Sequence, residues 1–140
     1  MPNADAGRIS QLLLEFYEKM SSWEHSVVKQ TGLSPAQMHT VELIGHHGSL
    51  QMKSLALKMG VTTGTLTVMI DRLEKMGLVA RVPHESDRRS YKTVLTLEGR
   101  HHHEEHHQRH LELTGELMAS LTEAETRQFM VSLEKVLDRF

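Results

Sequence analysis

Apolar side chains recur at intervals of three and four residues along most of the chain, which is the period of helices that bury one face. The first such segment covers residues 7–30 and predicts one long amphipathic helix. Its apolar positions are Ile9, Leu12, Leu13, Phe16, Met20, Trp23 and Val27. A second long segment, from Thr96 to about Ser120, and a third with Phe129, Leu133 and Leu137 predict two helices near the C-terminus.

Capping residues and glycines mark three shorter helices between these long ones. Pro35 suits the first helical position of the second helix, because its missing N–H has no partner there in any helix. The expected start and end residues are Ser34 and Gly48 for the second helix, Met52 and Gly60 for the third, and Thr62 or Thr63 and Gly77 for the fourth.

The period then changes to that of two short strands, Leu78–Val82 and Tyr91–Leu95, which the polar and basic segment Pro83–Ser90 joins as a hairpin. Thr122 and Glu125 form a capping box at the start of the sixth helix. The order of elements is therefore α-α-α-α-β-β-α-α, and the fold class is mainly α in one domain, residues 1–140.

Composition excludes several classes of protein. Hydrophobic residues make up 39% and charged residues 24% of the 140 positions, which is typical of a globular chain. The absence of cysteine removes disulfide scaffolds, thiolate zinc sites and cysteine nucleophiles. No apolar run is long enough to span a bilayer and no signal peptide precedes the first helix, so we expect a cytoplasmic protein with no membrane partner.

The formal net charge of −2 hides an uneven distribution of charge. Residues 51–95 hold 8 of the 16 Lys and Arg but only 4 of the 18 Asp and Glu. A basic centre between acidic ends is a pattern that favours a nucleic-acid partner for the central part.

The third helix, the turn Gly60–Thr62 and the fourth helix have the spacing of a helix-turn-helix, and a charged hairpin directly after them is typical of a winged helix. Short hydroxyl side chains would face the major groove, and arginines of the hairpin would reach phosphates or the minor groove. Threonines at a helix start also serve as caps, and arginines in a turn are often only solvated. The DNA-binding candidates are Thr62, Thr63, Thr65, Thr67, Arg72, Arg88 and Arg89.

The stretches TLTVMIDRLEKMGLVAR and DRRSYKTVLTLEGR resemble the recognition helix and wing of the MarR family of dimeric winged-helix repressors. The resemblance implies a DNA-binding part at residues 34–96 and dimerisation helices at 7–30 and 97–139. It implies a homodimeric transcriptional repressor that reads a pseudo-palindrome in double-stranded DNA. Val68 departs from the family, which often has a basic residue there, so base readout is expected to move to Thr65, Thr67 and Arg72.

Six of the 11 histidines lie in the run HHHEEHHQRH at residues 101–110. In a helix, residues four apart share a face, so His106 and His110 form one pair, and His102 with His106 and His103 with His107 form two others. Such a pair is a common way to hold a divalent metal ion, although a His-rich helix face taken alone is more often a solvated surface.

A zinc-sensing branch of the MarR family, the repressors of zinc uptake, is similar in more detail. The resemblance implies a zinc site made by Glu24, His39, His106 and His110, with zinc as corepressor. Because ligating histidines usually donate their other N–H to a carboxylate or carbonyl, Glu105 is the candidate to orient one imidazole. The second zinc site of that branch is not expected here, because it uses a cysteine and this chain has none. The other window histidines, 101, 102, 103 and 107, are expected to be solvated, and the same ligands would also admit Ni²⁺, Co²⁺ or Cu²⁺.

Two alternatives remain open at this point. A repressor of this family could be released by a small apolar or phenolic ligand, with the histidine window unused. A zinc hydrolase or a metal store is the more distant alternative, since His103 and His107 frame Glu104 in a pattern like that of metalloproteases. No pocket-forming sheet accompanies that pattern, so we do not expect an enzyme.

Overall fold

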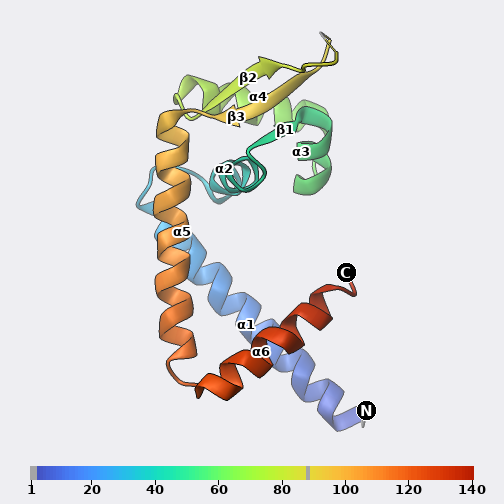
Figure 1. Cartoon of the computed structure of the whole chain (residues 1–140), viewed down its shortest axis with the longest axis vertical. Helices are drawn as coiled ribbons and strands as arrows, with labels where there is room; N and C mark the ends of the chain where they lie inside the picture. Colours follow the sequence, from blue (N-terminus) through green and yellow to red (C-terminus); the bar gives the residue numbers. More distant parts are fainter. Residues whose placement is uncertain (1–2, 88) are drawn as a thin grey trace. The chain divides into compact units, whose positions relative to one another are not determined.

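The computed structural model describes residues 3–87 and 89–140, which divide into two compact units on either side of the boundary between His103 and Glu104. Figure 1 shows the elements of both units. In the first unit the elements are α1 (Asn3–Lys29), α2 (Pro35–His47), β1 (Ser49–Gln51), α3 (Met52–Met59), α4 (Thr63–Lys75), β2 (Val79–Pro83), β3 (Tyr91–Leu95) and the start of α5 (Leu97–Met118). The second unit contains the rest of α5 and α6 (Glu123–Leu137). The predicted fold class is confirmed.

The predicted caps explain why the short helices begin and end where they do. The Ser34 hydroxyl accepts a hydrogen bond from the Gln37 backbone N–H, and the Gln37 side chain accepts one from the Ser34 N–H, so α2 starts with a full capping box. Thr62 caps α4 by accepting from the Thr65 N–H. Gly60 ends α3 with a φ of 67°, a left-handed conformation that glycine adopts without strain.

The sheet has one more strand than the sequence predicts. Its three antiparallel strands lie in the order β1-β3-β2, with Ala80 opposite Val94 and Leu50 opposite Thr93. The Thr93 hydroxyl also donates to the Leu50 carbonyl at 2.9 Å. Three residues are too few to show an alternating pattern, and β1 exists only because β3, some 40 residues later, supplies its hydrogen bonds.

The core of the first unit is made by the winged helix-turn-helix and the last turns of α1. The buried apolar side chains are Val28, Leu33, Met38, Val41, Ile44, Leu55, Ala56, Leu66, Ile70, Leu73, Leu78, Val79 and Leu95. Met76, the C-cap of α4, is exposed although the helical period of α4 places it inward.

Gly99 in the first turn of α5 packs directly on the backbone of the segment between α4 and β2. A Cβ atom at this position would overlap the carbonyl group of Leu78. The Thr96 hydroxyl accepts from the Gly99 N–H and donates to the Gly77 carbonyl. The start of α5 is thereby fixed against the wing within the first unit.

The second unit has no buried apolar side chain of its own. Thr122 and Glu125 form the predicted capping box of α6, with hydrogen bonds of 3.2 and 2.8 Å. Large apolar residues of α6 are nevertheless exposed in the single chain, among them Phe129, Met130, Leu133, Val136 and Leu137. No helix in the described part of the chain combines the length and apolar character that a membrane crossing requires.

Candidate nucleic-acid interface and candidate metal ligands

The four predicted threonines all lie exposed in the first turns of α4 or at its N-cap, but their hydroxyls differ in what they bond. Thr62 is the N-cap, and its hydroxyl also lies 3.1 Å from that of Thr65. The Thr67 hydroxyl donates to the Thr63 carbonyl at 2.8 Å. Capping therefore accounts for part of the threonine pattern, while all four side chains still present methyl groups and hydroxyl oxygens to solvent.

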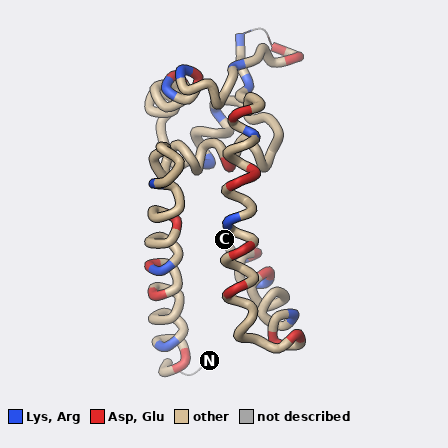
Figure 2. The backbone as a smooth tube through the Cα atoms, turned by 90° about the vertical axis from the view of Figure 1, so that its left-hand side faces the viewer, with Lys and Arg blue, Asp and Glu red and all other residues tan. Residues whose placement is uncertain are grey.

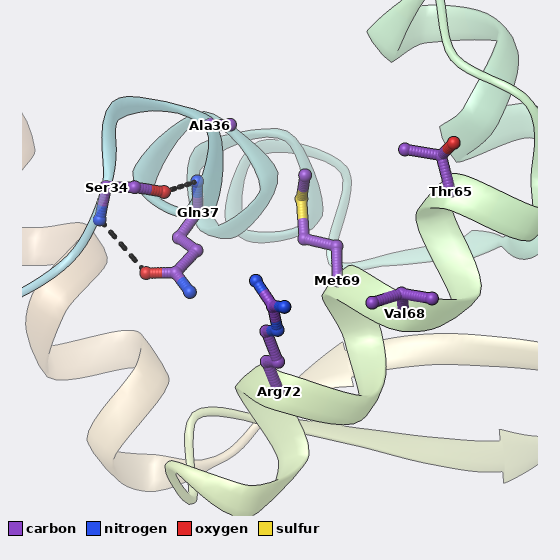
Figure 3. Close-up of a pocket in the computed structure, with 7 residues that line it drawn as sticks. All are labelled: Ser34, Ala36, Gln37, Thr65, Val68, Met69 and Arg72. Carbon is purple, nitrogen blue, oxygen red and sulfur yellow. Dashed lines mark hydrogen bonds between the residues drawn. The ribbon is translucent and has the colours of Figure 1, made fainter.

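A hollow of about 400 Å³ lies between the start of α2 and the exposed face of α4. Figure 3 shows Arg72 extending from α4 into this hollow, with Met69 and Val68 beside it and Gln37 across from it on α2. Val68, at the position where the resembled family often has a basic residue, is exposed. Arg72, one helical turn later, supplies a cation to the hollow, and its role in base readout stays a prediction.

Arg81 on β2, which no sequence pattern singles out, is bound to two acidic residues of α4. Its guanidinium lies 2.8 Å from Asp71 Oδ1 and 2.8 Å from Glu74 Oε2, and its backbone N–H donates to Glu74 at 3.1 Å. These contacts neutralise the Arg81 charge locally and fix strand β2 to α4. The sequence gives no periodic signal for this ion-pair cluster, because it joins two different elements.

The hairpin between β2 and β3 carries the second set of predicted cations. The Arg89 side chain is exposed, and its backbone N–H donates to the Asp87 carboxylate at 2.9 Å. Arg88 lies outside the described residues. Figure 2 shows Lys and Arg interspersed with Asp and Glu at α4 and at the hairpin, whereas Asp and Glu predominate along α5.

In the second unit, His106 and His110 meet as the four-residue spacing predicts. Their Nε2 atoms are 3.1 Å apart, and the two rings lie edge to face with centroids 4.7 Å apart. His106 is buried, with 4% of its surface exposed. Two imidazole nitrogens this close together are the part of a metal site that one helix can supply by itself.

The other two predicted ligands belong to the first unit. Glu24 is half-buried on α1, and His39 is exposed on α2. Glu105, the predicted orienting carboxylate, is exposed on α5. The structure thus brings His106 and His110 together, and the ligand roles of all four residues and of Glu105 stay predictions.

His103 is not solvated, and the prediction that it would be is wrong. Its Nδ1 lies 3.2 Å from the Glu42 carboxylate on α2, and its ring covers Gly45, where a Cβ would come within 2.5 Å of the imidazole. Only 23% of the His103 side chain is exposed. A residue of α2 without a side chain makes room for the ring, and this could not be read from the histidine spacing. His101 and His107 are exposed as expected, and His102 is half-buried.

Residues 33–91 match the family model described as MarR family. The HTH-type transcriptional repressor MdtR of Bacillus subtilis is 34% identical over 90 residues, which cover 64% of this chain and 58% of that repressor. The chain therefore spans less than two thirds of that relative.

Solved structures match over nearly the whole chain. Streptococcus pneumoniae FabT, in a crystal structure with DNA, has a TM-score of 0.84 and 25% identity, with 95% of each chain covered. A MarR family protein from Bacillus stearothermophilus has a TM-score of 0.91 at 22% identity, with 99% of this chain and 97% of that chain covered, which concerns the fold alone.

Proposed function

Because the family model and the relatives support this chain as a winged-helix transcriptional regulator of the MarR family, we propose that it binds double-stranded DNA as a homodimeric repressor and that zinc raises its affinity for DNA. The observation that carries the first half is the exposed face of α4 beside a basic hairpin. The observation that carries the second half is the His106–His110 pair.

The α4 face suits the major groove. Thr65 and Arg72 line one hollow of this face, so hydroxyl, methyl and guanidinium groups are spaced along one side of one helix. These groups recognise base edges and phosphates, and Arg89 extends the cationic surface to the hairpin. The core beneath α4, with Leu66, Ile70 and Leu73 fully buried, holds this face rigid.

Two variants test DNA binding once a preferred duplex has been selected from a random library. Arg89→Ala should weaken binding to every sequence and reduce the slope of log K against log salt by about one, as the loss of one phosphate contact does. Arg72→Ala should cost about 1–3 kcal/mol on the selected duplex and less on random DNA. A wild-type protein that selects no duplex, or an unchanged salt slope in Arg89→Ala, would contradict these roles.

The homodimer is supported by apolar faces that the single chain leaves open. Leu13 and Phe16 on α1 are 59% and 53% exposed, and Phe129 and Leu133 on α6 are 45% and 43% exposed. Apolar surface of this extent on two helices is rare in monomers and is covered in obligate dimers. A second copy of the chain presents the same faces, as a two-fold interface requires.

Zinc fits the histidine pair in both chemistry and spacing. Tetrahedral Zn²⁺ with bonds of about 2.0–2.1 Å keeps its ligand nitrogens roughly 3.4 Å apart, and the two Nε2 atoms lie 3.1 Å apart. We propose Glu24 and His39 as the remaining ligands, with Glu105 as the orienting carboxylate. Bound zinc supplies a cross-link between helices, and it raises DNA affinity only as far as it favours the DNA-binding geometry.

The test compares DNA affinity in buffered zinc and in chelator. Wild type should bind more tightly in zinc, and His106→Ala combined with His110→Ala should abolish the difference. His101→Ala combined with His107→Ala, on exposed positions of the same helix, is the matched control and should keep the full response. Protons compete for imidazole nitrogens, so the zinc response should decline below about pH 6. Equal affinity in zinc and chelator would overturn the zinc half of the proposal and leave the DNA half standing.

A further inference from the structure

A second hollow, of about 600 Å³, lies where the starts of α3 and α4 face the hairpin. It brings together side chains from three separate parts of the sequence, including Lys53 of α3, Thr63 of α4 and His84 and Arg89 of the hairpin. Among its described lining residues the acidic one is Asp87, whose carboxylate accepts the Arg89 backbone N–H. Positive charge and hydrogen-bond donors therefore prevail in an open trough.

The contacts of His84 with Ser86 indicate which ring nitrogen accepts a hydrogen bond and which one donates. The Ser86 backbone N–H lies 3.3 Å from His84 Nδ1, and the Ser86 hydroxyl lies 2.9 Å from the same atom. A backbone N–H can only donate, so Nδ1 is the acceptor and the ring proton sits on Nε2. His84 thus keeps a neutral Nε2–H donor while its other nitrogen is occupied.

We propose that this hollow seats a phosphodiester group of the DNA backbone, held by the Lys53 ammonium and the His84 Nε2–H. The inference rests on the proposed DNA binding and adds to it two residues that the sequence did not indicate. Lys53 supplies the charge that replaces a counterion, and His84 supplies a directed neutral hydrogen bond. Thr63 and Arg89 line the same hollow, so it is continuous with the predicted DNA surface. An open trough also suits a strand that must enter and leave.

The different charges of the two groups make them separable by experiment. The probe is a fluorescent random-sequence DNA duplex, titrated with the full-length protein at several salt concentrations. Lys53→Gln should weaken binding and reduce the salt slope by about one. His84→Phe should weaken binding about fivefold with an unchanged salt slope, since it removes a neutral hydrogen bond and no charge. His84→Gln, which restores an N–H donor, should recover most of that loss.

Lys58→Gln is the matched control, because Lys58 is exposed on the same helix and does not line the hollow. It should leave the salt slope unchanged, and the thermal unfolding of each variant checks that its fold is intact. A Lys53→Gln slope equal to that of Lys58→Gln, or a His84→Gln variant as weak as His84→Phe, would overturn the phosphate seat. A wild-type protein that binds no DNA would instead overturn the proposed function itself, so the two failures are distinguishable.

Discussion

Helices α4 and α6 are both amphipathic, yet the chain buries one and leaves the other open. Leu66, Ile70 and Leu73 of α4 are 0% exposed, whereas Leu133 of α6 is 43% exposed and α6 buries no residue. The helical period creates an apolar face in each case. What differs is the partner, which for α4 is the rest of the winged helix-turn-helix and for α6, in our proposal, is a second copy. An apolar face in the sequence thus predicts that a helix is buried, but it does not tell whether the same chain or a second copy covers it.

The sharpest test of this difference removes one leucine from each helix. Leu73→Ala should lower the free energy of unfolding by about 2–5 kcal/mol, because it opens a cavity in a closed core. Leu133→Ala should lower it by less, and by an amount that depends on protein concentration, because its partner is another chain. Chemical denaturation at two protein concentrations measures both. Equal losses that are independent of concentration would mean that α6 is covered within its own chain.

A charge placed on the exposed apolar face of α6 should separate the two copies without unfolding the winged helix-turn-helix. Phe129→Glu is expected to weaken dimerisation roughly 30-fold, the effect of losing one central interface residue. Leu57→Glu is the control, since Leu57 on α3 is 83% exposed and lies outside the α1 and α6 faces. Sedimentation velocity over a concentration series should show monomers for the first variant and wild-type behaviour for the second. Identical sedimentation of all three proteins would remove α6 from the interface.

The ends of the helices and the small sheet illustrate how far the sequence predicts the fold. Local signals fix local structure, so the cap at Thr62, the stop at Gly60 and the capping box at Thr122 are all confirmed. Strand β1 is the element that was missed, because its three residues gain strand structure only by pairing with β3. Met76 continues the apolar period of α4 and is nevertheless exposed, since a helical period does not say how far along the helix the covering core extends.

Within the winged helix-turn-helix, the ion pairs of Arg81 join strand β2 to α4, and their loss should have a smaller effect on stability. Arg81→Ala should lower the free energy of unfolding by about 1 kcal/mol, since the guanidinium is mostly buried but its partners are partly solvated. Lys92→Ala, which removes a looser 3.8 Å pair between Lys92 on β3 and Glu85 in the hairpin loop, should cost only a few tenths of that. Denaturant titration compares them. A larger loss for Lys92→Ala would show that the α4 contacts do not hold the wing.

The candidate site divides in the same way between local and distant information. The His106–His110 pair was predictable because both residues lie on one helix, where a separation of four fixes their approach. The contact of His103 with Glu42 and Gly45, and the hollow that gathers Lys53 and His84, join elements far apart in sequence. Charge and spacing indicate which residue types are available for such sites, but only packing decides which of them meet.

The smallest predicted effect concerns the N-terminal cap of α6, a helix that buries no residue in the single chain. Thr122→Ala should destabilise the helix locally by roughly 0.5 kcal/mol, at the low end for caps because α6 is exposed, and Thr122→Ser should restore most of it.

The same cap makes the stability of α6 depend on pH. The Glu125 carboxylate accepts hydrogen bonds from Thr122, chiefly from its backbone N–H and then from its side chain, and these hold the pKa of Glu125 below its ordinary value. A lowered pKa means that this contribution is present above the ordinary carboxyl pKa and is lost as the pH falls through the lowered one. Amide hydrogen exchange along α6 should therefore lose protection in acid for wild type and not for Glu125→Gln. If Thr122→Ala leaves exchange unchanged, contacts with other residues rather than the cap hold α6 in place, and the contrast with α4 is smaller than the exposed leucines indicate.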